Sequence, residues 1–403
     1  MNKQTPALQM HAANKGKISI VSKVRTANNE DLALAYTPGV AEPCEAIAED
    51  PAASYEYTAK GNLVAVVSDG SAVLGMGNVG PEAAMPVMEG KAILFKAFSG
   101  VDAMPICLDT QKPGEIIETV RRLAPTFGGI NLEDIASPQC FAIEKALDET
   151  LDIPVFHDDQ HGTAIVVAAA VLNSLKLTGK KIDEVKVVLN GPGSAGTAIM
   201  NMLLTMGVRR ARVCDEHGIL AANRSAPLAA HKKELALATN PSGEQGTLAD
   251  AIVDADIFIG VSVGNVLTKE MIATMKGEPI VFALANPIPE IMYDEAKAAG
   301  VRVMGTGRSD FPNQINNVLA FPGIFKGALS VRATTINAAM KIAAAHGIAD
   351  LVPADELSDT YIIPNPFDER VAPQVAAYVA EAAQKTGVSR LQQGGRRRPQ
   401  NYR

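Results

Sequence analysis

The sequence alternates between short apolar runs and longer segments whose apolar residues recur at helical spacing. Runs rich in valine and isoleucine, bounded by glycine, proline or acidic residues, are typical of buried parallel strands. Such runs occupy residues 63–68, 101–108, 128–134, 153–157, 185–190, 210–215, 256–262, 279–287 and 301–308. Segments of helical character occupy residues 81–95, 113–123, 138–147, 163–177, 197–206, 328–346 and 371–387. Strands that alternate with helices predict an α/β fold with parallel sheets.

The length of the chain favours two domains, because 403 residues exceed what one hydrophobic core usually holds. We expect residues 1–160 to form an N-terminal α/β domain for substrate and metal. Residues 161–390 are expected to form a Rossmann-like dinucleotide-binding domain closed by C-terminal helices. In residues 391–403, three consecutive arginines follow two glycines. A disordered basic tail is the favoured interpretation there, and a binding patch is the alternative.

Charge and cysteine content exclude several classes of protein. The net charge of −7 gives no support to nucleic-acid binding. The cysteines Cys44, Cys107, Cys140 and Cys214 form no Cys-x-x-Cys pair, which favours reduced thiols over a disulfide framework. The first residues lack the apolar core of a signal peptide, and the apolar run at 164–172 is shorter than the ~20 residues of a membrane span. We therefore predict a cytoplasmic protein with no membrane partner.

Acidic pairs follow two of the predicted strands. Glu133 and Asp134 end one run, and Asp158 and Asp159 lie between another run and a long alanine-rich helix. Open α/β folds bind ligands at the carboxyl ends of their strands, so we expect these side chains to converge. Carboxylate oxygens suit Mg²⁺ or Mn²⁺ better than zinc. For either pair alone, a solvated turn with an aspartate helix cap is the alternative.

Two further side chains are candidates for proton transfer. Lys91 follows Met88 by three residues and precedes Phe95 by four, so it shares their apolar helix face. A lysine on such a face commonly extends its ammonium to water. The alternative is a desolvated lysine with a lowered pKa, suited to act as a general base. Tyr36, just before a Thr-Pro-Gly turn, is either a packing residue or a proton donor delivered to a cleft.

Two glycine motifs of the form Gly-x-Gly-x-x-Gly occur in the chain. The one at residues 75–80 lacks an acid-ended second strand and predicts a tight turn that lines a cleft. The other lies between a strand and a helix, and the following strand ends in Asp215. That arrangement is typical of a dinucleotide fold, in which the acid holds a ribose hydroxyl. The loop consists of Gly191, Pro192, Gly193, Ser194, Ala195 and Gly196.

Together these motifs resemble the malic enzyme family in its shorter bacterial form. They stand in order over most of the chain at residues 36–41 (Tyr-Thr-Pro-Gly-Val-Ala), 75–78 (Gly-Met-Gly-Asn), 131–134 (Asn-Leu-Glu-Asp), 156–163 (Phe-His-Asp-Asp-Gln-His-Gly-Thr) and 305–310 (Gly-Thr-Gly-Arg-Ser-Asp). The resemblance implies oxidative decarboxylation of L-malate to pyruvate and CO₂ with reduction of NAD or NADP. It also implies dependence on Mg²⁺ or Mn²⁺ and a homodimer or higher homo-oligomer.

The resemblance also implies residue roles. They are Tyr36 as general acid, Lys91 as general base, Asp158 as an acid near that lysine, Glu133, Asp134 and Asp159 as metal ligands, the loop from Gly191 to Gly196 for the dinucleotide, and Asn286 and Asn317 near nicotinamide and malate. From the residues alone, both asparagines are also ordinary turn or cap residues. Other members carry an arginine for a substrate carboxylate where this chain has Ser71 and Ala72, so no residue is assigned that role.

The choice of cofactor and two other functions stay open at this point. Asp215 and Glu216 favour NAD because acids near the ribose repel a 2′-phosphate, whereas Arg224 and the lysines at 232–233 would reverse that preference. A metal-dependent 2-hydroxy-acid dehydrogenase or a malolactic enzyme would share the lysine and the acids. A non-catalytic regulator would bind NAD without metal-dependent turnover.

Overall fold

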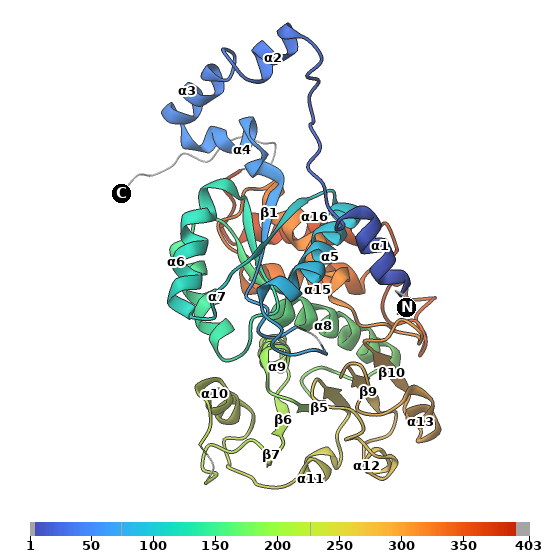
Figure 1. Cartoon of the computed structure of the whole chain (residues 1–403). Coiled ribbons are helices and arrows are strands. Elements are labelled where there is room, and N and C mark those ends of the chain that lie inside the picture. The colour runs from blue at the N-terminus through green and yellow to red at the C-terminus, as the bar shows by residue number, and fades with distance from the viewer. Residues whose placement is uncertain (1–4, 74, 226, 392–403) are drawn as a thin grey trace.

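The computed structural model describes residues 5–73, 75–225 and 227–391. A parallel sheet and a mostly parallel sheet follow one another along the long axis of the molecule, and the helix α8 (Asp158–Thr178) lies between them (Figure 1). This confirms the α/β class predicted from the alternation of strands and helices. The basic tail predicted from residue 391 onward lies, beyond that first residue, outside the described residues.

The first sheet has four parallel strands in the order β2-β1-β3-β4. They are β1 (Leu63–Ser68), β2 (Asp102–Cys107), β3 (Gly129–Leu132) and β4 (Val155–His157). One face packs against α5 (Pro81–Ser99), and the other packs against α6 (Pro113–Leu123) and α7 (Gln139–Thr150). Alternate valines of β1 therefore enter different cores, which explains why this strand is apolar throughout.

The second sheet has six strands in the order β10-β9-β8-β5-β6-β7, and only the β6–β7 pair is antiparallel. The strands are β5 (Lys186–Asn190), β6 (Arg210–Asp215), β7 (Gly218–Ile219), β8 (Ile257–Gly260), β9 (Ile280–Ala283) and β10 (Val303–Thr306). The helices of this part are α9 (Ser194–Thr205), α10 (Ala230–Thr239), α11 (Leu248–Ile252), α12 (Lys269–Ala273) and α13 (Tyr293–Ala298). The strand order reverses at β5, where ligands bind in such folds.

The C-terminal helices return to the first sheet, beside α5. They are α14 (Phe321–Ser330), which follows the short turn η4 (Asn317–Leu319), α15 (Ala338–Ala349) and α16 (Val371–Lys385). Phe95 of α5 meets the rings of Phe321 and Phe325 edge-on, with centroids 4.7 and 5.4 Å apart. One core thus includes residues of both sheets, α8 and these helices.

The N-terminal segment stands apart from both sheets. After α1 (Pro6–Asn14), an extended stretch leads to α2 (Asn29–Ala35) and α3 (Ala41–Glu49), which lie at one end of the molecule in Figure 1. The chain returns through η1 (Pro51–Ala53), α4 (Ser54–Tyr57) and η2 (Ala59–Asn62) to β1. Residues 18–50, the N-terminal arm, include no buried residue.

Three of the boundaries that differ from the sequence prediction bear on the site and on the closing helices. The helix expected from residue 163 already begins at Asp158, so Asp158 and Asp159 occupy its first turn. The positive end of the helix dipole stabilises carboxylates at that position. Residues 321–323, expected in a polar loop, begin α14, with a proline at a position that helix starts tolerate. The single helix expected at 328–346 is two helices, because residues 331–337 interrupt it.

Among the described helices, α8 has the length and apolar composition of a membrane span. Within the fold, 67% of its most apolar window is buried, as expected for a central core helix. Its apolar character is therefore explained by packing on α9 and α15.

Candidate active site

One cavity of about 660 Å³ is lined by residues that follow the strands of both sheets. Ser71 and Asp134 come from the first sheet, and Asp159 comes from the first turn of α8. Ser194, Asn286 and further residues after β5, β8, β9 and β10 form the opposite wall. The predicted turn at residues 75–80 contributes Gly75 and Gly77 to the lining.

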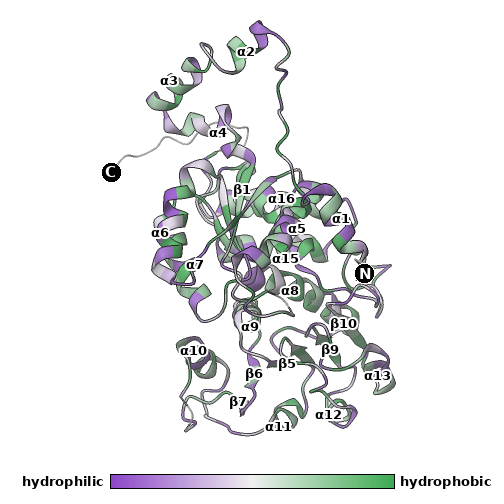
Figure 2. Ribbon diagram, in the orientation of Figure 1, coloured by the Kyte–Doolittle hydropathy of each residue, from purple (hydrophilic) through white to green (hydrophobic). Residues whose placement is uncertain are grey.

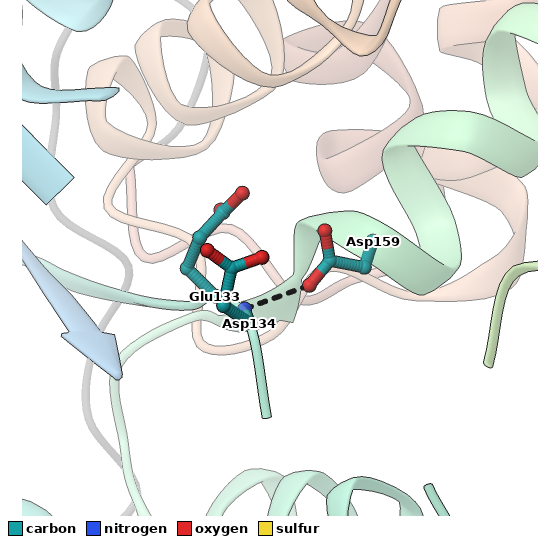
Figure 3. A group of neighbouring side chains, drawn as sticks. All are labelled: Glu133, Asp134 and Asp159. Carbon is teal, nitrogen blue, oxygen red and sulfur yellow. Dashed lines mark hydrogen bonds between the residues drawn. The ribbon is translucent and has the colours of Figure 1, made fainter. Parts of the chain in front are cut away.

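Three carboxylates converge at this cavity. Glu133, Asp134 and Asp159 each offer one oxygen, and these oxygens lie within 4.8 Å of one another. Figure 3 shows the three side chains together, with the backbone N–H of Asp134 donating to Asp159 Oδ2 at 2.8 Å. The N–H of Glu133 donates to the carbonyl of Val67 at 2.9 Å, which continues the sheet and holds the pair at the strand end.

The cluster fits a divalent cation. Burial raises the pKa of Asp134, and repulsion by Asp159 and then Glu133 raises it further. Burial also raises the pKa of Asp159. Asp134 Oδ2 is buried without a hydrogen-bond partner. Carboxylates that repel one another and leave an oxygen unsatisfied suit a hard cation such as Mg²⁺ or Mn²⁺.

Lys91 lies beside this cluster and is 7% exposed. Its Nζ lies 2.5 Å from Asp158 Oδ2, 2.9 Å from Glu133 Oε1 and 4.2 Å from the ring centroid of Phe321. Burial favours the neutral amine, but attraction to Asp158 and Glu133 outweighs it and raises the pKa of Lys91. Both sequence interpretations were therefore wrong in part: the ammonium does not extend to water, and its pKa is not lowered.

Asp158 is fully buried, and its position depends on a glycine that the sequence analysis did not single out. Gly162 lies one turn later in α8, and a Cβ there would collide with Oδ1 of Asp158. The same Cβ would lie 3.1 Å from Cβ of Asn317, a cavity residue. Gly162 thus leaves space for the carboxylate that pairs with Lys91. Because the sequence predicted a helix only from residue 163, Gly162 did not stand out as a glycine inside a helix.

The glycine loop between β5 and α9 fits a pyrophosphate. A Cβ on Gly193 would meet nothing within 4 Å, so a ligand can approach the backbone there. Gly193 caps α9 without a side-chain hydrogen bond, which leaves N–H groups at the helix start for an anion. A Cβ on Gly196 would collide with the carbonyl of Gly191, so the close packing of loop and helix requires glycine. Ser194 and Ala195 line the cavity.

Asp215 ends β6 as predicted, but it is already paired. Arg224 donates from Nη1 and Nη2 to its two oxygens, each at 2.9 Å, and Lys232 donates at 3.1 Å. Although burial opposes ionisation, these contacts lower the pKa of Asp215 to about 2. Two cations therefore surround one carboxylate where the ribose is expected.

A buried glutamate after β9, also not singled out from the sequence, connects the loops around Asn286. Glu290 accepts the N–H of Ser262 at 2.9 Å and the N–H of Ala285 at 3.0 Å. It is fully buried, so these charge-assisted hydrogen bonds fix the loops after β8 and β9. An isolated glutamate after a proline carries no pattern that sequence reasoning recognises.

Glu144 of α7, which does not line the cavity, fixes the start of α8. It accepts the backbone N–H of His157 at 3.0 Å and pairs with His161 Nε2 at 2.8 Å. Burial alone would raise the pKa of Glu144, but His161 and further positive groups lower it to about 2. The second histidine of the motif at 156–163 therefore serves to hold α7 against α8.

Tyr36 is a predicted site residue that the structure does not place at the cavity. It ends α2 in the N-terminal arm, and 67% of its surface is exposed. The described residues that line the cavity lie between 71 and 317, so none belongs to the arm.

Both halves of the chain match profiles of one protein family. The family profile described as "Malic enzyme, N-terminal domain" matches residues 13–148, and the profile "Malic enzyme, NAD binding domain" matches residues 160–384. The chain is 59% identical to the bifunctional malic/malolactic enzyme of Bacillus subtilis over 97% of this chain and 95% of that protein. It is 56% identical to the NAD-dependent malic enzyme of Geobacillus stearothermophilus over 93% of this chain and 78% of that protein.

A relative named for the other cofactor and a solved structure match as well. The chain is 50% identical to the NADP-dependent malic enzyme of Haemophilus influenzae over 93% of this chain, but it spans only 51% of that protein. The crystal structure of malic enzyme from Pyrococcus horikoshii superposes with a TM-score of 0.90 at 52% identity, over 94% of this chain and 89% of that one.

Proposed function

This chain belongs to the malic enzyme family, and we propose that it oxidatively decarboxylates L-malate to pyruvate and CO₂ with reduction of NAD or NADP. The observation that carries the proposal is the position of Lys91, which contacts Asp158 and Glu133 beside a cavity that also receives the dinucleotide loop. A redox cofactor, a base and a group of metal-ligating acids are what this reaction needs.

The metal site of the proposal consists of Glu133, Asp134 and Asp159. A bound Mg²⁺ or Mn²⁺ would supply Lewis-acid polarisation of the substrate oxygens. Lys91 would take the proton of the C2 hydroxyl, and a bound NAD or NADP would supply the hydride acceptor for C2. To act as a base the lysine must first lose its own proton, and Asp158, in contact with Lys91 Nζ, is positioned to accept it.

The reaction then needs an acid. Loss of CO₂ from the 2-oxo acid leaves the enolate of pyruvate, whose C3 requires a proton. In this proposal Tyr36 is the donor, and Asn286 and Asn317, on the wall of the cavity, orient nicotinamide and substrate. Asp158 acts through Lys91.

The ribose end of the cofactor site favours acceptance of NADP alongside NAD. The preference for NAD inferred from the sequence rested on uncompensated acids, but Arg224 and Lys232 both contact Asp215. Arg224 and Lys232 offset the charges of Asp215 and Glu216, so the acids no longer repel a 2′-phosphate. We therefore infer dual use of the cofactors, with Lys232 as the residue that contacts the phosphate.

The malolactic reaction is the second candidate, because the Bacillus subtilis relative is named for both activities. It would convert malate to lactate and CO₂ through the same lysine and acids, without net NADH. We also propose that the protein is a cytoplasmic homo-oligomer without nucleic-acid or membrane partners. Residues 1–160 and 161–390 form its two functional units in this proposal.

The test is NADH or NADPH absorbance with L-malate, Mn²⁺ and either cofactor, together with pyruvate and lactate assays. We expect reduced cofactor and pyruvate in equal amounts and loss of the signal with EDTA. Asp134→Asn should abolish turnover, whereas Asp152→Asn, at a surface acid that is far more exposed, should not. Lactate without net reduced cofactor would support the malolactic reaction, and no turnover of malate would refute both.

A further inference from the structure

A second cavity lies against the start of α8, on a different side from the active site. Its volume is about 490 Å³, and a recess of about 260 Å³ shares part of its lining. Its walls come from α7, α8, α9, α15 and the loop at residues 335–337. No described residue lines both this cavity and the active site. On α8, Asp159 and Thr163 line the active site, whereas Gln160, His161 and Ala164 line the second cavity.

The walls of the second cavity are mainly apolar. Figure 2 shows mainly hydrophobic residues along α8 and α15, which form two of these walls. The apolar lining residues are Phe141, Ala164, Ala198, Met202, Ile336, Ala338 and Ile342. Sites for small molecules usually measure roughly 300–1,000 Å³ and combine apolar walls with a few polar groups that orient the ligand. The second cavity has the size and the walls of such a site.

Most polar side chains of this lining already have partners within the protein. The hydroxyls of Thr197, Thr205 and Thr335 each donate to another protein oxygen. The side-chain amide of Asn337 likewise donates to a threonine hydroxyl at 2.9 Å. Asp148 accepts the hydroxyl of Thr335 at 2.7 Å. These groups are therefore satisfied without a ligand.

Two donors of the lining lack such a partner. Gln160 is 3% exposed, and its Nε2 is buried without a hydrogen-bond partner. The ammonium of Lys341 forms no hydrogen bond or ion pair with another described residue, and its Nζ lies 6.0 Å from the ring centroid of Phe156. Burial lowers the pKa of Lys341, although Glu144 and Asp148 act to raise it. A buried donor without an acceptor is costly, so an acceptor supplied by a ligand would be stabilising.

We propose that the second cavity binds a small organic carboxylate with an apolar body, whose oxygens accept from Lys341 Nζ and Gln160 Nε2. A carboxylate fits because both unpartnered groups are donors, and the apolar walls fit the body. The two acids near Lys341 are engaged elsewhere, Glu144 with His161 at 2.8 Å and Asp148 with Thr335. An organic ammonium would therefore find no unpaired carboxylate there.

The bound carboxylate acts on the proposed metal site through the first turns of α8. Gln160 directly follows Asp159, which is a proposed metal ligand. His161 pairs with Glu144, which also accepts the backbone N–H of His157 at 3.0 Å. A ligand that holds Gln160 thus changes the position of Asp159, and the carboxylate and the metal change each other's affinity. This effect rests on the proposed function, because it assumes the metal site, whereas binding in the cavity does not.

Calorimetry with hexanoate as the probe tests the binding site. EDTA-treated wild-type protein should bind hexanoate, and hexanol and hexylamine should bind more weakly. Lys341→Met removes the charge and should weaken hexanoate binding roughly 10-fold or more, as expected for loss of a charged hydrogen bond. Lys385→Met is the matched control, because Lys385 is 72% exposed on α16 and lies outside the cavity, and it should bind like the wild type. No binding to the folded wild type, or equal binding by Lys341→Met, would overturn the proposal.

Two further variants locate the probe. Ala338 is exposed and lines the cavity, so Ala338→Phe narrows the cavity without a change in the buried core and should also weaken binding. Asp134→Asn alters the proposed metal site and should bind hexanoate as the wild type does. Loss of hexanoate binding in Asp134→Asn would show that the probe enters the active site instead, and would overturn the proposal.

The effect on the metal site is measured by titration of Mn²⁺ with and without saturating hexanoate. The Mn²⁺ affinity of the wild type should change by about 5-fold or more, the lower end of common coupling between sites. The same titration of Lys341→Met should show no effect of hexanoate. Unchanged Mn²⁺ affinity in the wild type would refute the coupling. Wild-type protein that binds hexanoate but does not turn over malate would refute the proposed function and leave the second site supported.

Discussion

Gly162→Ala is expected to disable the active site while leaving the fold intact. The added methyl would collide with Oδ1 of Asp158, one turn earlier on the same helix face. Relief of the collision requires the carboxylate to move by about 1 Å, and a displacement of that size at a catalytic group costs on the order of 100-fold in rate. That loss corresponds to about 2.7 kcal/mol of activation free energy. Alanine is otherwise the better helix residue, so the melting temperature should change little.

The assay is kcat for malate oxidation with saturating cofactor and Mn²⁺, combined with thermal unfolding. Gly114→Ala is the control, because a Cβ there meets nothing within 4 Å although the residue is also helical. It should leave kcat unchanged and stabilise by up to about 1 kcal/mol. If Gly162→Ala kept kcat within twofold of wild type, the space at Gly162 would have no part in holding Asp158 against Lys91.

Three further predictions concern the metal, the cofactor and pH. Asp159→Asn removes one metal ligand and should weaken Mn²⁺ binding, measured by calorimetry, by more than about 10-fold. Mutation of residues that only support the ligands already causes a loss of that size. Unchanged affinity would exclude this residue as a ligand. Lys232→Ala should lower kcat/KM for NADP by roughly 10- to 100-fold, since a charged hydrogen bond contributes about 1.5–3 kcal/mol, and should affect NAD little. An equal loss with both cofactors would refute a phosphate contact. The pKa of Glu144 is about 2 in the fold against an ordinary value of 4.5, so its pairing stabilises the protein above pH 4.5 and this contribution is lost as pH falls toward 2. In urea unfolding, the free energy of unfolding of the wild type should exceed that of Glu144→Gln by a constant amount above neutrality, and this difference should vanish as pH falls toward 2. A difference that does not depend on pH would contradict the pairing.

Local sequence patterns predicted most strands and several core helices, but no range was predicted for α10 to α13, and the starts of α8, α9 and α14 were placed too late. The limits of β6 at 210–215 and α6 at 113–123 agree with the prediction, because acids, prolines and valine-rich runs mark their ends. The start of α8 was placed five residues late, since Asp158 and Asp159 read equally well as a turn. The start of α14 was missed because its Phe-Pro-Gly sequence is typical of a turn. Gly323 is needed there, as a Cβ would come within 2.6 Å of Val375 in α16.

The sequence predicted the site residues that lie in recognisable motifs, but not the contacts that depend on the fold. The acidic pairs, the glycine loop and the asparagines were found because each follows a strand, and parallel strands bring their carboxyl ends together. The raised pKa of Lys91 was not predictable, because it depends on contacts with Asp158 and Glu133 that only the fold creates. The separation of Tyr36 from the cavity is likewise tertiary, since no local pattern tells which way an arm extends.

The core shared through α8 bears on how the protein unfolds and how far it can be divided. Valines of β1, the body of α8, strand residues of the second sheet and the C-terminal helices belong to one apolar cluster. If one sheet loses its packing, apolar side chains of the other sheet therefore become exposed to water. We therefore expect calorimetry to give one cooperative transition rather than two. A gene cut near residue 160 should yield fragments that fail to fold alone. Although two sequence profiles match the chain, we expect it to unfold as a single unit.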